Sequence, residues 1–150
     1  SREDPRGWAA GYLHQRGPQR FEEGEPHMVR LQGIDAPESR QPFGQRSKQY
    51  LSSLVFGQQV VVQWSKRDRY GRIVGQVVLP DGTDANLAQL QAGLAWFFRR
   101  YEREIDEPTR RVYSEAETVA RAQKRGLWSD LASTPPWDFR RAERGSGSGE

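Results

Sequence analysis

The sequence contains no cysteine, so disulfide bonds and thiolate metal sites are excluded. It also has no apolar run that approaches the roughly 20 residues needed to cross a bilayer as a helix. No signal peptide is visible at its start and no internal repeat is found. A chain of 150 residues is long enough for one domain with one sizeable core, which must supply the stability that disulfides do not.

The charges that are present are nearly balanced but unevenly distributed. There are 23 basic and 20 acidic residues, which gives a net charge of +3. The basic residues cluster in segments 66–72, 99–111, 121–125 and 140–144. A local positive field attracts polyphosphates even when the net charge of the chain is small. The alternative interpretation of these basic clusters is an ordinary solvated, charged surface.

The chain is organised around the ten residues from Val29 to Glu38, which read VRLQGIDAPE. Their first half alternates in polarity as a half-buried strand does, and Ala36-Pro37 then ends the strand. Arg30, Asp35 and Glu38 thus stand close together on one short, rigid segment. The pattern favours a site that cleaves phosphodiesters. The alternative interpretation is a solvated strand end at which the arginine and the aspartate form an ion pair.

Hydrophobic periodicity and turn residues predict a mainly β fold with helices, of the α+β class. The expected strands are 8–13, 19–23, 27–33, 58–64, 73–79 and 94–98, and the expected helices are 43–56, 85–92 (capped by Asp84) and 109–124. Sequential short strands followed by helices suggest a five-stranded OB-type barrel flanked by about three helices, with atypical first strands. We expect an N-terminal segment, 1–26, a barrel domain, 27–130, and a flexible tail, 131–150, that is rich in glycine and serine at its end.

A second informative stretch is Asp68-Arg69-Tyr70-Gly71-Arg72. The glycine permits a tight turn, after which Arg72 begins a strand and can reach back over the mouth of the barrel. A guanidinium fork suits two phosphate oxygens and stays charged at any working pH. Arg30 and Arg72 could together neutralise a phosphate in reaction, while a turn with an ion-paired arginine is the simpler alternative.

These stretches, with AGLAWFFRRY at 92–101 and EAETVARAQKRGLW at 115–128, resemble the staphylococcal nuclease-like family, the thermonucleases. Four separated motifs occur in the same order and cover roughly residues 27–130. The resemblance implies a calcium-dependent nuclease that hydrolyses DNA and RNA on an OB-fold barrel. Such a protein is expected to be secreted or periplasmic.

The resemblance also implies roles for five residues. Arg30 matches an arginine that stabilises the scissile phosphate, and Arg72 matches its partner near the leaving group. Asp35 matches a calcium-ligating carboxylate, and the backbone carbonyl of Ala36 matches a second calcium ligand. Glu38 matches the general base that activates the attacking water. The chemistry is consistent, because a hard cation prefers carboxylate and carbonyl oxygens.

The same resemblance assigns nucleic-acid contacts to residues around the mouth of the barrel. Tyr70 and Tyr101 match aromatic positions that line the nucleotide pocket, and the basic loop adds Lys66 and Arg69. Stacking on an aromatic ring tolerates any base, which suits a nuclease that prefers single-stranded DNA or RNA without sequence specificity. We expect the protein to act as a monomer.

The sequence departs from the family pattern at the first metal motif, Asp-Gly-Asp-Thr, which is absent. Counting back about fourteen residues from Arg30 reaches Arg16, where the second aspartate of that motif is expected. His14 is a poor substitute for a hard cation, and the nearby glutamates are Glu22, Glu23 and Glu25. The alternatives are therefore a working nuclease and a nucleic-acid-binding module that has lost catalysis. A purely structural or protein-interaction barrel is a third interpretation, which leaves the Arg–Asp–Glu cluster unexplained.

Overall fold

The computed structural model describes the backbone of residues 2–4, 8–12, 14–16 and 26–148, and the side chains of residues 27–100 and 103–145. The described strands are β1 (Arg2–Asp4), β2 (Trp8–Tyr12), β3 (His14–Arg16), β4 (Pro26–Leu31), β5 (Ile34–Asp35), β6 (Val61–Arg67), β7 (Ile73–Val78) and β8 (Trp96–Phe97). The helices are α1 (Gly44–Val55), α2 (Ala85–Gln91), α3 (Glu107–Ala122) and α4 (Pro136–Ser148), with 3-10 helices η1 (Arg99–Glu104) and η2 (Gly126–Ser129). The α+β class expected from the sequence is therefore observed.

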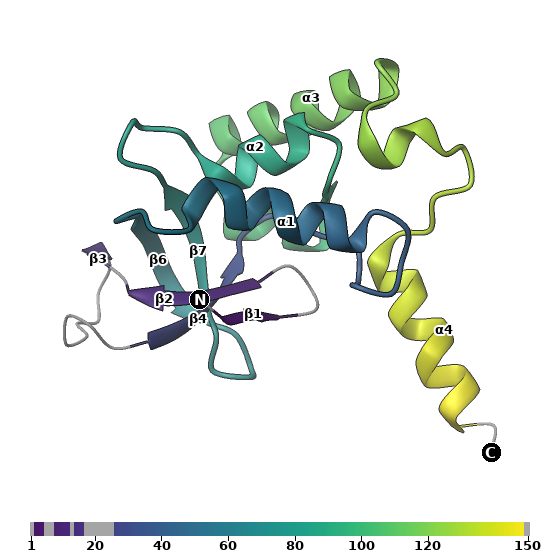
Figure 1. Ribbon diagram of the computed structural model, residues 1–150, viewed down its shortest axis with the longest axis horizontal. Helices are drawn as coiled ribbons and strands as arrows, with labels where there is room; N and C mark the ends of the chain where they lie inside the picture. The colour runs from purple at the N-terminus through teal and green to yellow at the C-terminus, as the bar shows by residue number, and fades with distance from the viewer. Residues whose placement is uncertain (1, 5–7, 13, 17–25, 149–150) are drawn as a thin grey trace.

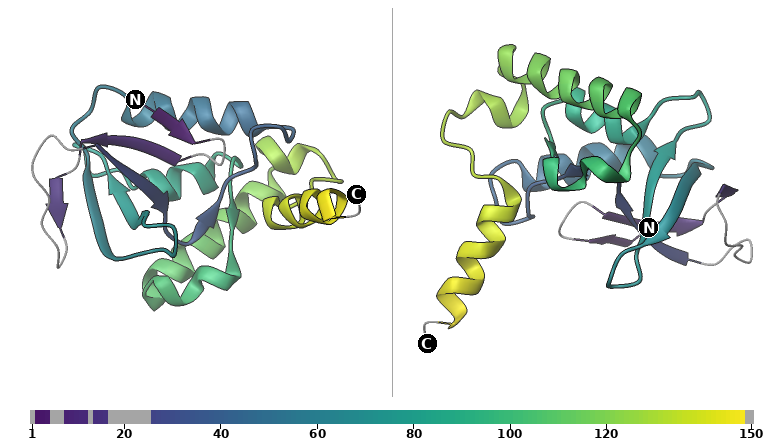
Figure 2. Two further views of the ribbon diagram at one scale, coloured as in Figure 1. Left: turned by 90° about the horizontal axis from the view of Figure 1, so that it is seen from below. Right: turned by 180° about the vertical axis from the view of Figure 1, so that it is seen from behind.

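The described strands form two sheets. The larger has the order β1-β2-β4-β7-β6-β3, in which β4 runs parallel to β7 and β3 runs parallel to β6. The smaller pairs β5 with β8. This order is linear, so the pairings among the described strands do not show the closed five-stranded barrel that the sequence suggested. Helices α1, α2 and α3 lie together on one side of the larger sheet, and α4 projects away from them (Figures 1 and 2).

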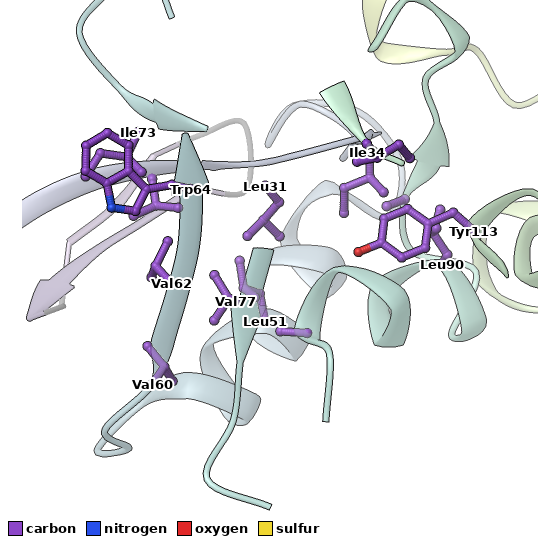
Figure 3. Packing of buried hydrophobic residues seen from close by; sticks show 14 of the residues in the cluster. Leu31, Ile34, Leu51, Val60, Val62, Trp64, Ile73, Val77, Leu90 and Tyr113 are labelled. Atoms are coloured by element: carbon purple, nitrogen blue, oxygen red, sulfur yellow. The ribbon is translucent and has the colours of Figure 1, made fainter. Parts of the chain in front are cut away.

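The core lies between the sheet and these helices. Val62 and Trp64 of β6 point inward, with exposed residues between and after them, as expected for a strand with one face on the core. Leu31 of β4, Val77 of β7 and Leu51 of α1 meet them there, as Figure 3 shows. None of the helices in the described part of the chain combines the length and apolar character that a bilayer crossing requires.

Several predicted elements have different bounds in the structure. The strand expected at 58–64 is β6, which starts at Val61 and continues through Arg67 because it pairs with β7 as far as Ile73. The last core helix starts at Glu107 rather than 109, since Asp106 accepts a hydrogen bond from Thr109 N at 2.8 Å and Pro108 fits the first turn. The strand expected at 19–23 lies outside the described residues.

The fourth α-helix is the largest difference from the prediction of about three. Residues 131–150, expected to be a flexible tail, contain α4 from Pro136 to Ser148. The physical reason is that Pro136 and Trp137 pack against the domain and fix the first turn, so tertiary contacts outweigh the weak helix propensity of the glycines and serines.

Asp84 joins the helical layer to the sheet. Its side chain caps α2 by accepting from Leu87 N at 3.1 Å, as predicted, and it also accepts from Gln76 Nε2 at 2.9 Å and from the Tyr113 hydroxyl at 2.7 Å. Tyr113 is almost fully buried, and burial together with the negative charge of Asp84 raises the pKa of its hydroxyl. The hydroxyl therefore stays protonated and acts as a donor.

Replacing Asp84 with alanine is expected to lower the free energy of unfolding by about 2–4 kcal/mol. The variant loses the α2 cap and leaves the buried Tyr113 hydroxyl without this acceptor. Urea unfolding followed by circular dichroism measures the change. The control is Asp81→Ala in the exposed turn, where Asp81 accepts from Thr83 N at 3.0 Å and a much smaller loss is expected. Equal losses for the two variants would contradict this role of Asp84.

Candidate active site

The turn that ends β4 places Asp35 within the domain. Gly33 adopts φ +79°, a backbone conformation that favours glycine, and an added Cβ would meet the side chains of Ile105 and Tyr113. Phe98 N donates to Gly33 O at 3.1 Å, and Asp35 pairs with Trp96 of β8. Asp35 is thereby fixed at the end of a short strand, and the residue as a whole is 8% exposed.

Arg30 lies on β4 and is 6% exposed, which is unusual for a charged side chain. Its Nη2 donates to Glu104 Oε1, and its Nε lies 3.9 Å from Asp68 Oδ2. Glu104 belongs to η1, and its other oxygen accepts from Gly33 N at 3.3 Å. Two carboxylates thus compensate one buried guanidinium and connect it to the turn before Asp35.

Arg72 is held beside Arg30 by a shared carboxylate. Its Nε donates to Asp68 Oδ2 at 2.6 Å, and the backbone N–H groups of Arg72 and Tyr70 donate to Asp68 Oδ1 at 3.0 and 2.8 Å. Burial raises the pKa of Asp68, but these hydrogen bonds and the charge of Arg72 outweigh it, and the pKa is lowered. The structure therefore brings both predicted arginines to one ionised aspartate.

Tyr70 is an exposed aromatic ring beside this arginine pair. Its side chain is 63% exposed, and the guanidinium carbons of Arg69 and Arg72 each lie 4.8 Å from the ring centroid. Lys66 is half-exposed and its Nζ lies 3.5 Å from Glu104 Oε1. Two guanidiniums therefore lie against an exposed aromatic ring, and Lys66 reaches the glutamate that pairs with Arg30. The backbone of Tyr101 lies in η1, and its side chain is outside the described residues.

Asp35 and Glu38 both face the guanidinium of Arg140, which comes from α4. Arg140 Nη2 donates to Asp35 Oδ2 at 2.6 Å and Nη1 donates to Asp35 Oδ1 at 3.3 Å. The same Nη1 lies 3.6 Å from Glu38 Oε1. This residue was missed by sequence reasoning, because it stands in the segment expected to be a flexible tail.

Aromatic packing holds the start of α4 against the domain. The rings of Trp137 and Phe98 stack with centroids 4.3 Å apart and an interplanar angle of 5°. Trp96, which neighbours Asp35 in the β5–β8 pair, meets Trp137 edge to face at 5.5 Å. Aromatic pairs in these geometries add stability beyond the area that they bury. Arg140 is therefore presented from an anchored helix.

Gln41 joins the Glu38 loop to the segment before α4. Its side-chain oxygen accepts from Glu38 N at 2.8 Å, and its Nε2 donates to Thr134 O at 2.8 Å. The residue is 7% exposed, so both bonds are shielded from water. Gln41 was not predicted, and a buried glutamine in a polar loop carries no sequence signal that distinguishes it.

The acidic pair offers carboxylate oxygens to the calcium ion that the family resemblance implies. Asp35 and Glu38 converge on one cation, the Arg140 guanidinium, so their oxygens suit a positive charge at this position. Within the described residues no group of three or more His, Asp or Glu side chains is placed to hold a metal. Ca²⁺ also accepts backbone carbonyls and water, so the two carboxylates fit the anionic part of such a site. His14 and Arg16 lie on β3, and β7 and β6 separate that strand from β4.

Comparison with known proteins gives consistent relatives. The family model described as staphylococcal nuclease homologue matches residues 28–130. A protein named uncharacterized endonuclease from Escherichia coli is 46% identical over 112 residues, which cover 75% of this chain and 69% of that protein. A protein named micrococcal nuclease from Shigella flexneri is 43% identical over 124 residues, which cover 77% of this chain and 69% of that protein.

A third relative, named uncharacterized endonuclease, comes from Haemophilus influenzae and is 37% identical over 116 residues. That match covers 77% of this chain and 61% of the relative. The family model covers more than half of the chain and includes both the arginine pair and the acidic pair. The chain therefore belongs to the staphylococcal nuclease homologue family.

Proposed function

We propose that this protein is a nuclease that hydrolyses phosphodiester bonds of DNA and RNA and depends on calcium. The observation that carries the proposal is the gathering of Arg30 and Arg72 on Asp68, on a chain segment that leads directly into Asp35 and Glu38. Two guanidiniums can take up the charge of a phosphate, and a nearby carboxylate can accept a proton from water. Family membership supports the same reaction class.

In the proposed reaction Glu38 accepts a proton from water as the water oxygen bonds to phosphorus and one P–O ester bond breaks. Arg30 and Arg72 bind the non-bridging oxygens and stabilise the negative charge that builds up on them. The leaving oxygen takes up a proton from the solvent. Asp35 and the Ala36 carbonyl would hold the calcium ion, which supplies electrophilic assistance to the phosphate when bound.

Substrate selection follows from the face around Tyr70. Its exposed ring and the adjacent Arg69 favour an unpaired base stacked on the tyrosine with its backbone phosphate nearby. Lys66 and Tyr101 are proposed to extend this contact. We therefore propose a preference for single-stranded DNA and RNA, with little dependence on base sequence.

The remaining features are proposals that rest on the family resemblance. The sheet is proposed to form the five-stranded OB-type barrel of the family, with first strands that depart from its usual pattern. The protein is proposed to act as a monomer and to be exported to the periplasm or the medium. Size-exclusion chromatography and fractionation of expressing cells test the last two.

A nucleic-acid-binding module without catalysis is the second candidate function. The observation that favours it is the bidentate pairing of Asp35 with Arg140, together with the missing first metal motif. Both candidates share the arginine pair and the Tyr70 face. They differ in whether the acidic pair takes part in chemistry.

Digestion of heat-denatured DNA and of RNA, with millimolar calcium or with excess chelator, tests the proposed function. We expect cleavage of both substrates with calcium and loss of cleavage in chelator, because the carboxylates need the cation to act on a phosphate. Cleavage that persists in chelator contradicts calcium dependence. Binding of single strands in both conditions without any cleavage supports the binding module instead.

A further inference from the structure

The acidic pair already has a cation, and that cation is supplied by the chain itself. We propose that Arg140 of α4 occupies the cation position of Asp35 and Glu38 and competes there with a divalent metal ion. Metal binding then requires that the guanidinium leaves these carboxylates. The inference rests on the proposed function, because it assigns a control of metal loading to the same site.

The geometry makes the two cations mutually exclusive at Asp35. Both oxygens of Asp35 accept from Arg140, at 2.6 and 3.3 Å, in the fork arrangement that guanidinium and carboxylate favour. The side chains of Asp35 and Arg140 are 10% and 22% exposed, so water screens the pair weakly. A calcium ion ligated by Asp35 needs at least one of these oxygens.

The position of α4 does not depend on Arg140 alone. Trp137 stacks on Phe98, Gln41 contacts Thr134, and Arg40 pairs with Glu143 farther along the helix. These contacts keep the guanidinium near the carboxylates and so raise its effective concentration there. Because of these contacts, a substitution at Arg140 can remove the guanidinium from the carboxylates while α4 stays packed against the domain.

A purely structural ion pair leads to the opposite expectation. If Arg140 only fastens α4 to the Glu38 loop, removing it loosens the loop and calcium affinity stays equal or falls. If Arg140 competes with the metal, removing it takes the competing cation away from Asp35 and calcium affinity rises. The direction of the change in calcium affinity therefore separates the two roles.

The experiment is isothermal titration calorimetry of the full chain with calcium chloride. It measures the calcium dissociation constant of the wild type, Arg140→Gln and Arg141→Gln. Arg141 is the matched control, since it is the next residue on α4 and its Nη1 lies 3.7 Å from Asp138 Oδ1 on the same helix. We expect about tenfold tighter calcium binding by Arg140→Gln than by the wild type. The apparent calcium affinity of the wild type is its intrinsic affinity multiplied by the fraction of molecules in which Arg140 has left the carboxylates. We expect less than about a twofold change for Arg141→Gln.

A second variant and a second measurement cover the case in which Arg140→Gln folds poorly. Arg140→Lys keeps the charge but loses the fork, so it is expected to bind calcium with intermediate affinity. The calcium-induced rise in Tm is expected to increase in the order wild type, Arg140→Lys, Arg140→Gln. Equal or weaker calcium binding by both Arg140 variants overturns the inference, as does an absence of calcium binding by all four proteins.

These readouts do not use turnover, so the inference and the proposed function can fail separately. Tighter calcium binding by Arg140→Gln without DNA cleavage by any variant supports the inference and contradicts the nuclease. Calcium-dependent cleavage with unchanged calcium affinity in Arg140→Gln supports the nuclease and contradicts the inference.

Discussion

Replacing Glu38 with glutamine is expected to reduce kcat for cleavage of denatured DNA by about 10²–10⁴-fold. The amide has nearly the shape of the carboxylate but cannot accept the proton of the attacking water. The main-chain bond from Glu38 N to Gln41 Oε1 is unaffected by the substitution, so the loop is expected to keep its position. Initial rates on a fluorescent single-stranded oligonucleotide at saturating calcium measure the change.

Binding of the oligonucleotide by Glu38→Gln serves as the first control and is expected to match the wild type, because the arginine pair and Tyr70 are intact. Glu115→Gln is the matched control for a glutamate outside the site. Glu115 is exposed on α3, and its replacement is expected to leave the rate unchanged. A Glu38→Gln rate within about threefold of the wild type would exclude Glu38 as the general base.

Replacing Arg30 with methionine is expected to affect both stability and activity strongly. The substitution removes the guanidinium that pairs with Glu104, whose side chain is only 7% exposed, while Asp68 keeps its pair with Arg72. Removing one partner of a buried ion pair costs about 3–5 kcal/mol of unfolding free energy. Loss of a charge-stabilising donor is expected to reduce cleavage by at least about 10²-fold. Urea unfolding and initial rates measure the two effects.

A double-mutant cycle with Glu104→Gln separates these two effects. Lys66 also lies near Glu104, so part of the charge is compensated in the single variant. We expect Arg30→Met/Glu104→Gln to lose less unfolding free energy than the sum of the two single losses, since the unpaired carboxylate is neutralised. Activity is expected to stay low, because the guanidinium is still missing. Recovery of activity together with stability would show that Arg30 has only a structural role.

The arginine pair could be predicted from the sequence because each arginine stands beside a local signal. Arg30 lies within a stretch whose alternating polarity indicates a strand. Arg72 comes directly after a turn that contains Gly71. The residue that joins them, Asp68, stands four residues before Arg72 in the same turn, and the ion-paired arginine that the sequence offered there as the simpler alternative is observed. Glu104 carries no such signal, because its contact with Arg30 spans 74 positions of sequence.

The role of Arg140 could not be predicted because glycine and serine dominate the end of the chain. Such a composition normally indicates a flexible segment. The signal that argues for a helix is upstream, where Pro136 can occupy a first helical turn and Trp137 supplies an apolar anchor. Whether this anchor finds a partner depends on Phe98 and Trp96, and a single sequence does not reveal that contact.

Strand bounds were predicted less well than helix bounds for a related reason. The predicted helix at 43–56 has clear ends and agrees closely with α1, while β6 extends into polar residues that periodicity alone excludes. Lys66 and Arg67 belong to β6 only because β7 lies beside them and accepts their backbone pairing. Pairing of this kind depends on a partner strand and is therefore invisible in local patterns.

The contact between Arg140 and Asp35 also bears on the order in which the molecule assembles. The two residues are 105 positions apart, so closing the loop between them costs more entropy than forming the hairpin of β6 and β7. During synthesis the N-terminal part of a chain emerges first. Asp35 and Glu38 are therefore made and can be positioned before α4 exists, and for that interval the nascent domain holds its acidic pair without the arginine.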